Sequence, residues 1–297
     1  MVAPTPATFQ KRRELSTFIE RQLAHEPAVQ AVIGIGSLAS GLARPDSDID
    51  AILFLEPFDA YIVPAEFKWR SADGSFHSIF AGDIPPGDCL NFDFVRLDLA
   101  QWADLAYEWP EARRAELSQG WMAFDRTGRV AELIAARTTY SDEVRIAKLD
   151  DAITWLDQHL SEDGPQVRWE SLGPAIAHDR LQAAYEYLAQ ALFAYNRTWR
   201  PWRNREMSVL LTLPWLPQGF PERVLGALCA PSPGYRGYMA RAQALLGLFH
   251  DLLARLSADG VYGEDCIGEA FIRSHEEPGR AWNMAEWNLK HKERTVK

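Results

Sequence analysis

Two apolar runs near the N-terminus are joined by a small-residue turn and a loop, and the second run begins with a pair of carboxylates. The first run ends at Gly36-Ser37, and the second directly follows Asp48-Ile49-Asp50. Short apolar runs bounded by turn residues are typical of buried strands. Alternate residues of a strand point to the same face, so Asp48 and Asp50 are expected to project together, about 7 Å apart along the strand. The sequence therefore predicts a strand, a tight turn, a loop and a second strand that starts with two acids.

The paired acids and the turn before them indicate one kind of ligand. Like charges held close together are unfavourable unless a cation lies between them, and Mg²⁺ prefers carboxylate and phosphate oxygens. A Gly-Ser turn has little side-chain bulk, so its backbone N–H groups can approach a phosphate. We therefore expect Gly36, Ser37, Asp48 and Asp50 to hold a metal-bound nucleoside triphosphate. The alternative is that both acids lie at the solvated end of a loop.

A third oxygen ligand is needed for the usual pair of metal ions, which lie about 3.5–4 Å apart and stabilise the attacking and leaving oxygens. Asp93 is the candidate, because it interrupts a largely apolar run over 90–98 that is expected to form a strand. The alternative for Asp93 is a surface position on an edge strand. Asp98 is the rival ligand, but its place at the end of the run favours a role as the N-cap of the next helix.

Composition and charge limit the class of protein and of partner. The chain has 297 residues, enough for two domains, of which 47% are hydrophobic and 24% charged, as in globular proteins. No run is long and apolar enough for a membrane span, and the N-terminus lacks the apolar core of a signal peptide. The 3 cysteines form no paired motif, so we expect a reduced, cytoplasmic protein. The net charge of −10 disfavours a long nucleic acid and suits a small cationic substrate.

The order of the expected elements indicates an α/β (α+β) fold in two domains. Strands are expected at 29–35, 49–55, 76–81, 90–99 and 121–124, with helices at 9–24 and 130–137. Further along, apolar residues recur every three or four positions, which is typical of amphipathic helices. We therefore predict a mixed-sheet domain over 1–140 and an α-helical bundle over 141–297. A final helix with Trp282 and Trp287 is expected to pack on the bundle or on another subunit, and the sequence leaves the oligomeric state open.

The motif as a whole resembles the polymerase-β-like nucleotidyltransferase superfamily: Gly36-Ser37, then Asp48 and Asp50 at the start of a strand, then Asp93 on a later strand. The resemblance covers roughly residues 28–100 and implies a mixed-sheet nucleotidyltransferase domain. It implies that Asp48 and Asp50 bind two Mg²⁺ ions, that Asp93 binds the catalytic ion, and that ATP is the donor. A helical domain in second place is similar to that of bacterial antibiotic nucleotidyltransferases, which adenylylate aminoglycosides and lincosamides.

Four arginines follow the longest helical pattern of the second domain, at Arg197, Arg200, Arg203 and Arg205. We expect the helix to end in this basic cluster. In the related enzymes such a helix end grips the triphosphate, and the planar guanidinium group bonds phosphate bidentately. The resemblance therefore implies that Arg203 and Arg205 bind the nucleotide. The alternative is a basic helix end that only complements the helix dipole.

Three further residues of the second domain are candidates for the same reaction. Arg180, near the start of the long helix, is a second candidate for a phosphate contact. Glu186 or Glu206 is a candidate base for the acceptor. For both glutamates the alternative is an ordinary solvated position on a helix.

The function predicted from these residues and the resemblance is transfer of a nucleoside monophosphate onto a hydroxyl of a small molecule such as an aminoglycoside, with release of pyrophosphate. The acceptor is expected between the two domains, where pockets commonly form. A non-catalytic, antitoxin-like partner with the same fold and transfer onto a protein or a tRNA are the alternatives. A dinucleotide site is disfavoured because the acids begin the second strand instead of ending it. The 7 histidines show no metal-ligand spacing.

Overall fold

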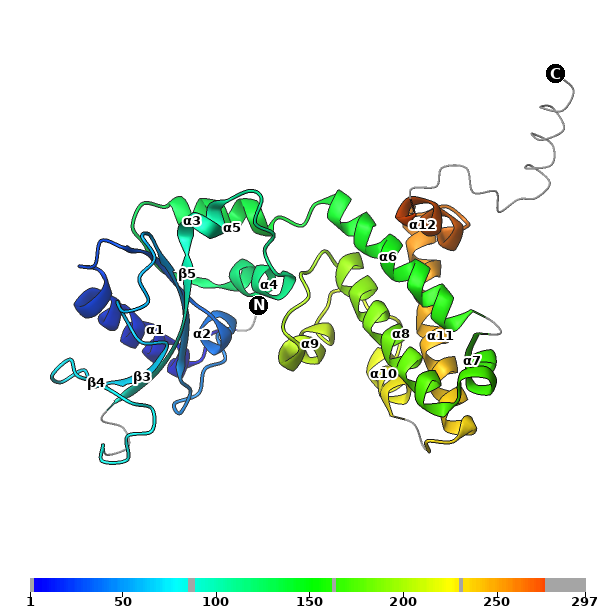
Figure 1. Ribbon diagram of the computed structural model, residues 1–297, viewed down its shortest axis with the longest axis horizontal. Helices are drawn as coiled ribbons and strands as arrows, with labels where there is room; N and C mark the ends of the chain where they lie inside the picture. The colour runs from blue at the N-terminus through cyan, green and yellow to red at the C-terminus, as the bar shows by residue number, and fades with distance from the viewer. Residues whose placement is uncertain (1–2, 85–88, 162–163, 230–231, 276–297) are drawn as a thin grey trace, which may run out of the picture. The chain divides into compact units, whose positions relative to one another are not determined.

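Two compact units make up the protein. The computed structural model describes residues 3–84, 89–161, 164–229 and 232–275, and the chain divides into Met1–Thr139 and Tyr140–Lys297 (Figure 1). The first unit is a mixed α/β structure around a sheet and the second is helical, which confirms the predicted fold class. The predicted helix with Trp282 and Trp287 lies outside the described residues. Among the described residues, no helix is long and apolar enough to cross a membrane.

The N-terminal unit combines short helices with the strands of the sheet. Its first helix is capped by Thr5, whose side chain accepts a hydrogen bond from the Thr8 N–H at 3.1 Å. The elements of this unit are, in chain order, α1 (Pro6–Phe18), the π-helical turn η1 (Ile19–Leu23), β1 (Val29–Gly34), α2 (Gly36–Ser40), β2 (Ile49–Leu55), β3 (Glu66–Trp69), β4 (Phe76–His77), β5 (Leu90–Asp98), α3 (Leu99–Ala103), α4 (Glu111–Gln119), β6 (Trp121–Asp125) and α5 (Arg129–Thr138).

The strands of this unit form a mixed sheet in the order β4-β3-β5-β2-β1-β6. β2 and β5 run parallel, and the other neighbouring strands run antiparallel. Successive side chains alternate between the two faces. Leu53 packs toward α1 and η1 on one face, whereas Ile52 packs toward α3, α4 and α5 on the other. Figure 1 shows α1 and α4 on different sides of the sheet. Both faces of β2 are therefore covered along its apolar run, while Asp48 just before it is exposed and Asp50 is half-buried.

Four of the expected strands form within one residue of their predicted bounds, at 29–35, 49–55, 90–99 and 121–124. The strand predicted over 76–81 is wrong beyond its first two residues, because β4 covers only Phe76–His77 and a turn follows. Its neighbour β3 is a strand that the sequence analysis missed. The four residues of β3 alternate between polar and buried apolar side chains, but so short a run does not by itself distinguish a strand from a loop.

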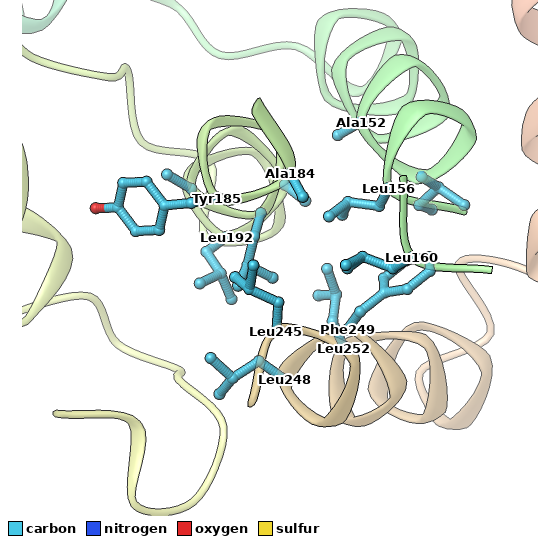
Figure 2. Packing of buried hydrophobic residues seen from close by; sticks show 14 of the residues in the cluster. Ala152, Leu156, Leu160, Ala184, Tyr185, Leu192, Leu245, Leu248, Phe249 and Leu252 are labelled. Carbon is cyan, nitrogen blue, oxygen red and sulfur yellow. The ribbon is translucent and has the colours of Figure 1, made fainter. Parts of the chain in front are cut away.

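The C-terminal unit is a bundle whose three longest helices share one apolar core. Leu156, Leu192 and Leu245 come from these three helices and point into the space between them (Figure 2). Apolar residues at intervals of three and four place one face of each helix in this core, as the sequence pattern predicts. The elements of the unit are α6 (Asp142–Leu160), α7 (Gly164–Leu172), α8 (Pro174–Tyr195), α9 (Arg203–Leu210), α10 (Phe220–Leu228), α11 (Tyr235–Ala258) and α12 (Cys266–Ser274).

The expectation that the long helix ends in the arginine cluster is wrong. α8 stops at Tyr195, and a new helix, α9, begins at Arg203. Asn196 ends α8: its side-chain N–H donates to the Leu192 carbonyl at 2.8 Å, and its side-chain oxygen accepts from the Trp215 N–H at 2.9 Å. The backbone then turns into the left-handed region at residue 197, with φ 52°. A proline at position 201 further disfavours helix for the residue before it.

Candidate active site

The turn after β1 depends on a glycine that touches one of the paired acids. Ile35 keeps an extended backbone, and its N–H donates to the Asp50 carbonyl at 3.0 Å. Gly36 has a φ of +56°, which side-chain-bearing residues rarely adopt. A Cβ atom at Gly36 would lie 2.8 Å from Asp50 Oδ2. The Gly-Ser turn and the Asp50 carboxylate therefore lie against each other.

Ser37 follows in the first turn of α2 and is half-buried. The first N–H groups of a helix have no partner within that helix. The N–H groups of Gly36 and Ser37 are therefore not used by α2 itself. Since Gly36 also carries no side chain, an acceptor atom can approach this turn closely.

The predicted third acid lies directly beside the pair. β2 and β5 are parallel neighbours, and their register places Asp50 opposite Asp93. Neighbouring strands are about 4.8 Å apart. Asp50 shares a face with Ile52, and Asp93 shares a face with Val95, because alternate residues of a strand point the same way. Ile52 and Val95 both pack toward α3, so Asp50 and Asp93 lie on the same face of the sheet.

A fourth carboxylate, which the sequence analysis missed, extends this line by one strand. Glu66 of β3 lies opposite Asp93 of β5 in an antiparallel pair. Phe67 and Trp69 are buried on the α1 face, so Glu66 points to the other face, together with Asp93. We call Glu66, Asp93, Asp50 and the neighbouring Asp48 the carboxylate row. The available sequence signal was the polar–apolar alternation of Glu66-Phe67-Lys68-Trp69, which is the pattern of a strand.

The carboxylate row concentrates negative charge. Partial burial raises the pKa of the Asp93 carboxyl, and the nearby charges of Glu66 and Asp48 raise it further. Within the described residues, no Lys, Arg or His side chain makes a hydrogen bond or ion pair with Asp48, Glu66 or Asp93. Lys68 lies on the same face, two residues after Glu66, but its ammonium group donates to the Ala81 carbonyl at 2.8 Å.

The kind and placement of these donors suit a hard divalent cation. They are carboxylates on one face of the sheet, next to a turn at which a Cβ atom would meet Asp50. Among the residues that the structure describes, no three His, Cys, Asp or Glu side chains are gathered closely enough to hold a metal ion. Carboxylates on neighbouring strands repel one another without a cation between them, and an ion would draw their side chains together.

The predicted nucleotide-binding arginines belong to the other unit, where an ion-pair network holds one of them. Arg203 Nη1 lies 2.6 Å from Glu186 Oε1 and 2.8 Å from Glu206 Oε1. Arg200 binds the same two carboxylates, with Nε 2.5 Å from Glu206 Oε2. Glu206 is only 3% exposed, and the hydroxyl of Tyr185 donates to it at 3.4 Å. In Figure 2 this hydroxyl points away from the three-helix core.

This network changes the expectations for several residues of the second unit. Glu186 and Glu206 were candidate bases, but both carboxylates are bonded to guanidinium groups, which favours a structural role. Arg203 is held by the same pairs. Arg205 is exposed, and among the described residues its guanidinium group has no hydrogen bond or ion pair. Arg180 is exposed on α8 and is the other arginine candidate outside the network.

Comparisons with known proteins do not assign a function to these residues. The chain matches no protein-family model and no curated protein. Among solved structures it is similar to a nucleotidyltransferase-like protein from Exiguobacterium sibiricum, with a TM-score of 0.44 and 13% sequence identity. The match covers 93% of this chain and 83% of that chain. A likeness of this size carries no argument for function, which rests on the residues themselves.

Proposed function

We propose that this protein transfers a nucleoside monophosphate from a nucleoside triphosphate to a hydroxyl group of a small molecule. One observation carries the proposal: Asp50 and Asp93 lie side by side in the register of β2 and β5, with Asp48 nearby and the Gly36 turn against Asp50. A turn that a phosphate can approach, beside carboxylates on neighbouring strands, supports a role in metal-dependent phosphoryl chemistry.

The reaction would break one bond to phosphorus and form another. The acceptor oxygen would attack the α-phosphorus and its proton would pass to the Asp93 carboxylate, while the bond from the α-phosphorus to the bridging oxygen breaks and pyrophosphate leaves. Asp48, Asp50 and Asp93 would hold Mg²⁺, and two such ions, when bound, supply positive charge for the triphosphate and lower the pKa of the attacking hydroxyl. The turn at Gly36 and Ser37 would donate its backbone N–H groups, and the Ser37 hydroxyl, to phosphate oxygens.

ATP is the proposed donor, and a cationic small molecule such as an aminoglycoside-like antibiotic is the proposed acceptor. The charge of the chain, −10, and the carboxylate row both favour a positively charged acceptor over a polyanion. Arg205 is the proposed phosphate contact from the second unit, because its guanidinium group is exposed and free of carboxylates among the described residues. Arg203 would support it by holding the start of α9.

Two other functions use the same fold. A non-catalytic partner protein would not need a turn that leaves room beside a carboxylate, or acids in register on neighbouring strands. Transfer to a protein side chain would use the same acids, and transfer to a tRNA would additionally require a basic surface. Retardation of tRNA by the purified protein at moderate salt would favour the tRNA acceptor.

The proposal is tested first by nucleotide binding and then by turnover. Calorimetric titration with ATP and Mg²⁺ is expected to give saturable heat, and no heat at millimolar nucleotide would favour a non-catalytic partner. Pyrophosphate release is then measured for each nucleoside triphosphate against a panel of hydroxyl-bearing antibiotics. Release that depends on one acceptor, and that EDTA abolishes, is the expected result. Nucleotide binding without acceptor-dependent release from any member of the panel would contradict a small antibiotic acceptor.

A further inference from the structure

The triphosphate turn, formed by Gly36 and Ser37, opens a helix that cannot hold its own position. α2 has only five residues, Gly36–Ser40, and so short a helix is not stable by itself in water. Gly36 is exposed and Ser37 is half-buried, whereas the next residue, Leu38, is fully buried. The position of the turn is therefore set by the groups that contact α2 and the loop after it.

One of these groups is Arg12 of α1, whose guanidinium group reaches α2. Its Nε and Nη2 atoms both donate to the Leu38 carbonyl oxygen, at 3.1 and 2.6 Å. The last carbonyl groups of a helix have no donor within that helix, and a charged donor makes a stronger hydrogen bond than a neutral one. The central guanidinium carbon of Arg12 lies 5.0 Å from the centroid of the Trp121 ring. Arg12 thereby joins α1, α2 and β6.

The two groups that Arg12 contacts also pack on the end of β1, directly before the turn. Trp121 lies opposite Gly34 in the pairing of β6 with β1. A Cβ atom at Gly34 would lie 3.0 Å from Trp121 Cε3 and 3.4 Å from Leu38 Cδ2, so both side chains lie close against the strand. Gly34 comes before Gly36 and Leu38 comes after it. The contacts of Arg12 therefore support the chain on both sides of Gly36.

The N-terminal end of α1 holds the loop that leads from α2 toward Asp48. The Thr5 hydroxyl donates to the Ala43 carbonyl at 2.8 Å, and the Thr8 hydroxyl oxygen accepts from the Ala43 N–H at 3.0 Å. The Thr5 N–H donates to the Gly41 carbonyl at 2.9 Å. Thr8 is fully buried. α1 therefore holds the segment between the triphosphate turn and Asp48 at more than one point.

We propose that Arg12 is a positioning residue for the reaction: by holding the Leu38 carbonyl, it keeps the N–H groups of the triphosphate turn in place for the phosphate oxygens. Donors that are already in place bind a ligand more tightly than donors that must first be ordered. Arg12 acts through α2 and not by touching the substrate. The inference rests on the proposed function, because it takes the ligand of the turn from it.

The test compares Arg12→Met with a matched variant, Arg126→Met. Arg126 also donates to a backbone carbonyl, that of Val29, at 2.9 Å, and its guanidinium carbon lies 5.4 Å from the centroid of the Phe124 ring. These contacts are at the start of β1, whereas the triphosphate turn follows the end of this strand. A role in stability alone predicts the same behaviour for both variants.

Two quantities are measured for each variant, and urea unfolding checks that each is folded. Hydrogen exchange in the metal-free and nucleotide-free protein reports how firmly α2 is held, at the N–H groups of Leu38 and Ala39, which donate to the Ile35 carbonyl. The dissociation constant of a non-hydrolysable ATP analogue with Mg²⁺ reports the affinity of the site for the nucleotide. Arg12→Lys is added as the conservative variant, because it keeps the positive charge and an N–H donor.

In Arg12→Met, we expect exchange at these N–H groups to be about tenfold faster than in the wild type, and the dissociation constant to be about five- to tenfold higher. Arg126→Met should keep both values within about twofold of the wild type, because its contacts are remote from the turn. Arg12→Lys should lie between Arg12→Met and the wild type. If Arg12→Met does not fold, Arg12→Lys is compared with Arg126→Lys in the same way.

The inference is overturned if the Arg12 variant binds the ATP analogue like the wild type, whatever its exchange rates. It is also overturned if the Arg126 variant weakens binding equally, because a general loss of stability would then explain the effect. If the wild type binds no ATP analogue with Mg²⁺, the proposed function fails and this inference fails with it. Binding by the wild type that the Arg12 variant leaves unchanged removes only the role of Arg12.

Discussion

At the scale of single residues, the pairing of Glu66 with Asp93 has a measurable effect on stability. Partial burial, and then the charges of Glu66 and Asp48, raise the pKa of Asp93, so the folded state binds a proton there more readily than the unfolded chain. Stability is consequently lost as the pH rises from the unfolded pKa, about 3.9, through the raised pKa of the folded state. Ionised Asp93 and Glu66 repel each other at neutral pH.

Glu66→Gln is therefore expected to stabilise the metal-free protein at pH 7 by roughly 0.2–1 kcal/mol. The gain should shrink as the pH falls through the Asp93 pKa, because the repulsion disappears when either carboxyl is protonated. Urea unfolding in EDTA, at pH 7 and near pH 3.5, measures both effects. A gain of equal size at both pH values would show that the repulsion is not its cause.

The two arginines at the start of α9 are expected to behave differently. Arg203→Ala removes one partner from the buried Glu206 and one from Glu186, so we expect a loss of about 1–3 kcal/mol in unfolding free energy. Arg205→Ala should change stability by less than about 0.5 kcal/mol, while raising KM for the nucleotide severalfold if Arg205 binds phosphate. Denaturant unfolding and initial rates separate the two roles. An unchanged KM in Arg205→Ala would remove Arg205 from the phosphate site.

His159 gives the C-terminal unit a predicted sensitivity to acid. Burial first, and then the charges of Arg168 and Arg180, lower the pKa of His159 from 6.5 to about 4. The unfolded chain therefore binds the proton more readily, and stability that is complete above about pH 6.5 is lost as the pH falls toward 4. The loss is on the order of 2–3 kcal/mol. Urea unfolding at pH 7 and pH 4.5 measures this loss. Between these pH values the unfolding free energy of His159→Gln should fall by less than that of the wild type, and an equal fall in both proteins would exclude His159 as the cause.

At the scale of elements, the turn between β1 and α2 offers a controlled substitution. Gly36→Ala places a Cβ atom in a left-handed backbone conformation and 2.8 Å from Asp50 Oδ2. Gly128 has a similar φ, +81°, but a Cβ atom there would meet nothing within 4 Å. Both alanine variants are expected to lose about 1 kcal/mol of stability through backbone strain.

Only Gly36→Ala should also impair the proposed reaction, because its methyl group displaces the Asp50 carboxylate and narrows the approach to the turn. Urea unfolding and pyrophosphate release are measured for both variants. Equal activity in Gly36→Ala and Gly128→Ala would mean that the close approach between Gly36 and Asp50 has no functional role.

The strands that were predicted well from the sequence are those whose own residues are buried along most of their length, because such burial leaves an apolar run in the sequence. β2 is covered on both faces, and this requires the apolar run after Asp50. The short strand β3 was missed, because its residues become a strand only when β5 and β4 pair with it. Glu66 was missed for the same reason. Its position opposite Asp93 arises from a register between strands that no local pattern contains.

The end of α8 was also decided by contacts between distant residues. The side chain of Asn196 bonds both to Leu192 in its own helix and to Trp215, nineteen positions away. The run of arginines suggested one continuous basic helix end. In the structure, Arg200 and Arg203 lie after a break and bind Glu186 and Glu206. The charges of the arginines were visible in the sequence, but their carboxylate partners were not.

At the scale of the whole molecule, each unit holds one group of charged residues. The carboxylate row lies in the N-terminal unit, on elements whose faces are fixed by two apolar clusters. The arginine network lies in the C-terminal unit, against α8 and α9. The spacing of Gly36, Asp48 and Asp50 in the sequence predicts a metal ion and a phosphate at this turn. The sequence contains no comparable pattern for the acceptor.

The most direct test of the central claim follows the label of α-³²P-ATP into an acceptor found in the pyrophosphate-release panel. The wild type, in Mg²⁺, is expected to transfer the labelled monophosphate to the acceptor. Asp48→Ala should be verified as folded by its urea unfolding curve. We expect it to reduce the rate of transfer by a factor of at least about 100, because it removes a carboxylate that would hold the metal ions and so stabilise the transition state. Transfer at the wild-type rate by Asp48→Ala would contradict the assignment of Asp48, Asp50 and Asp93 as the catalytic site.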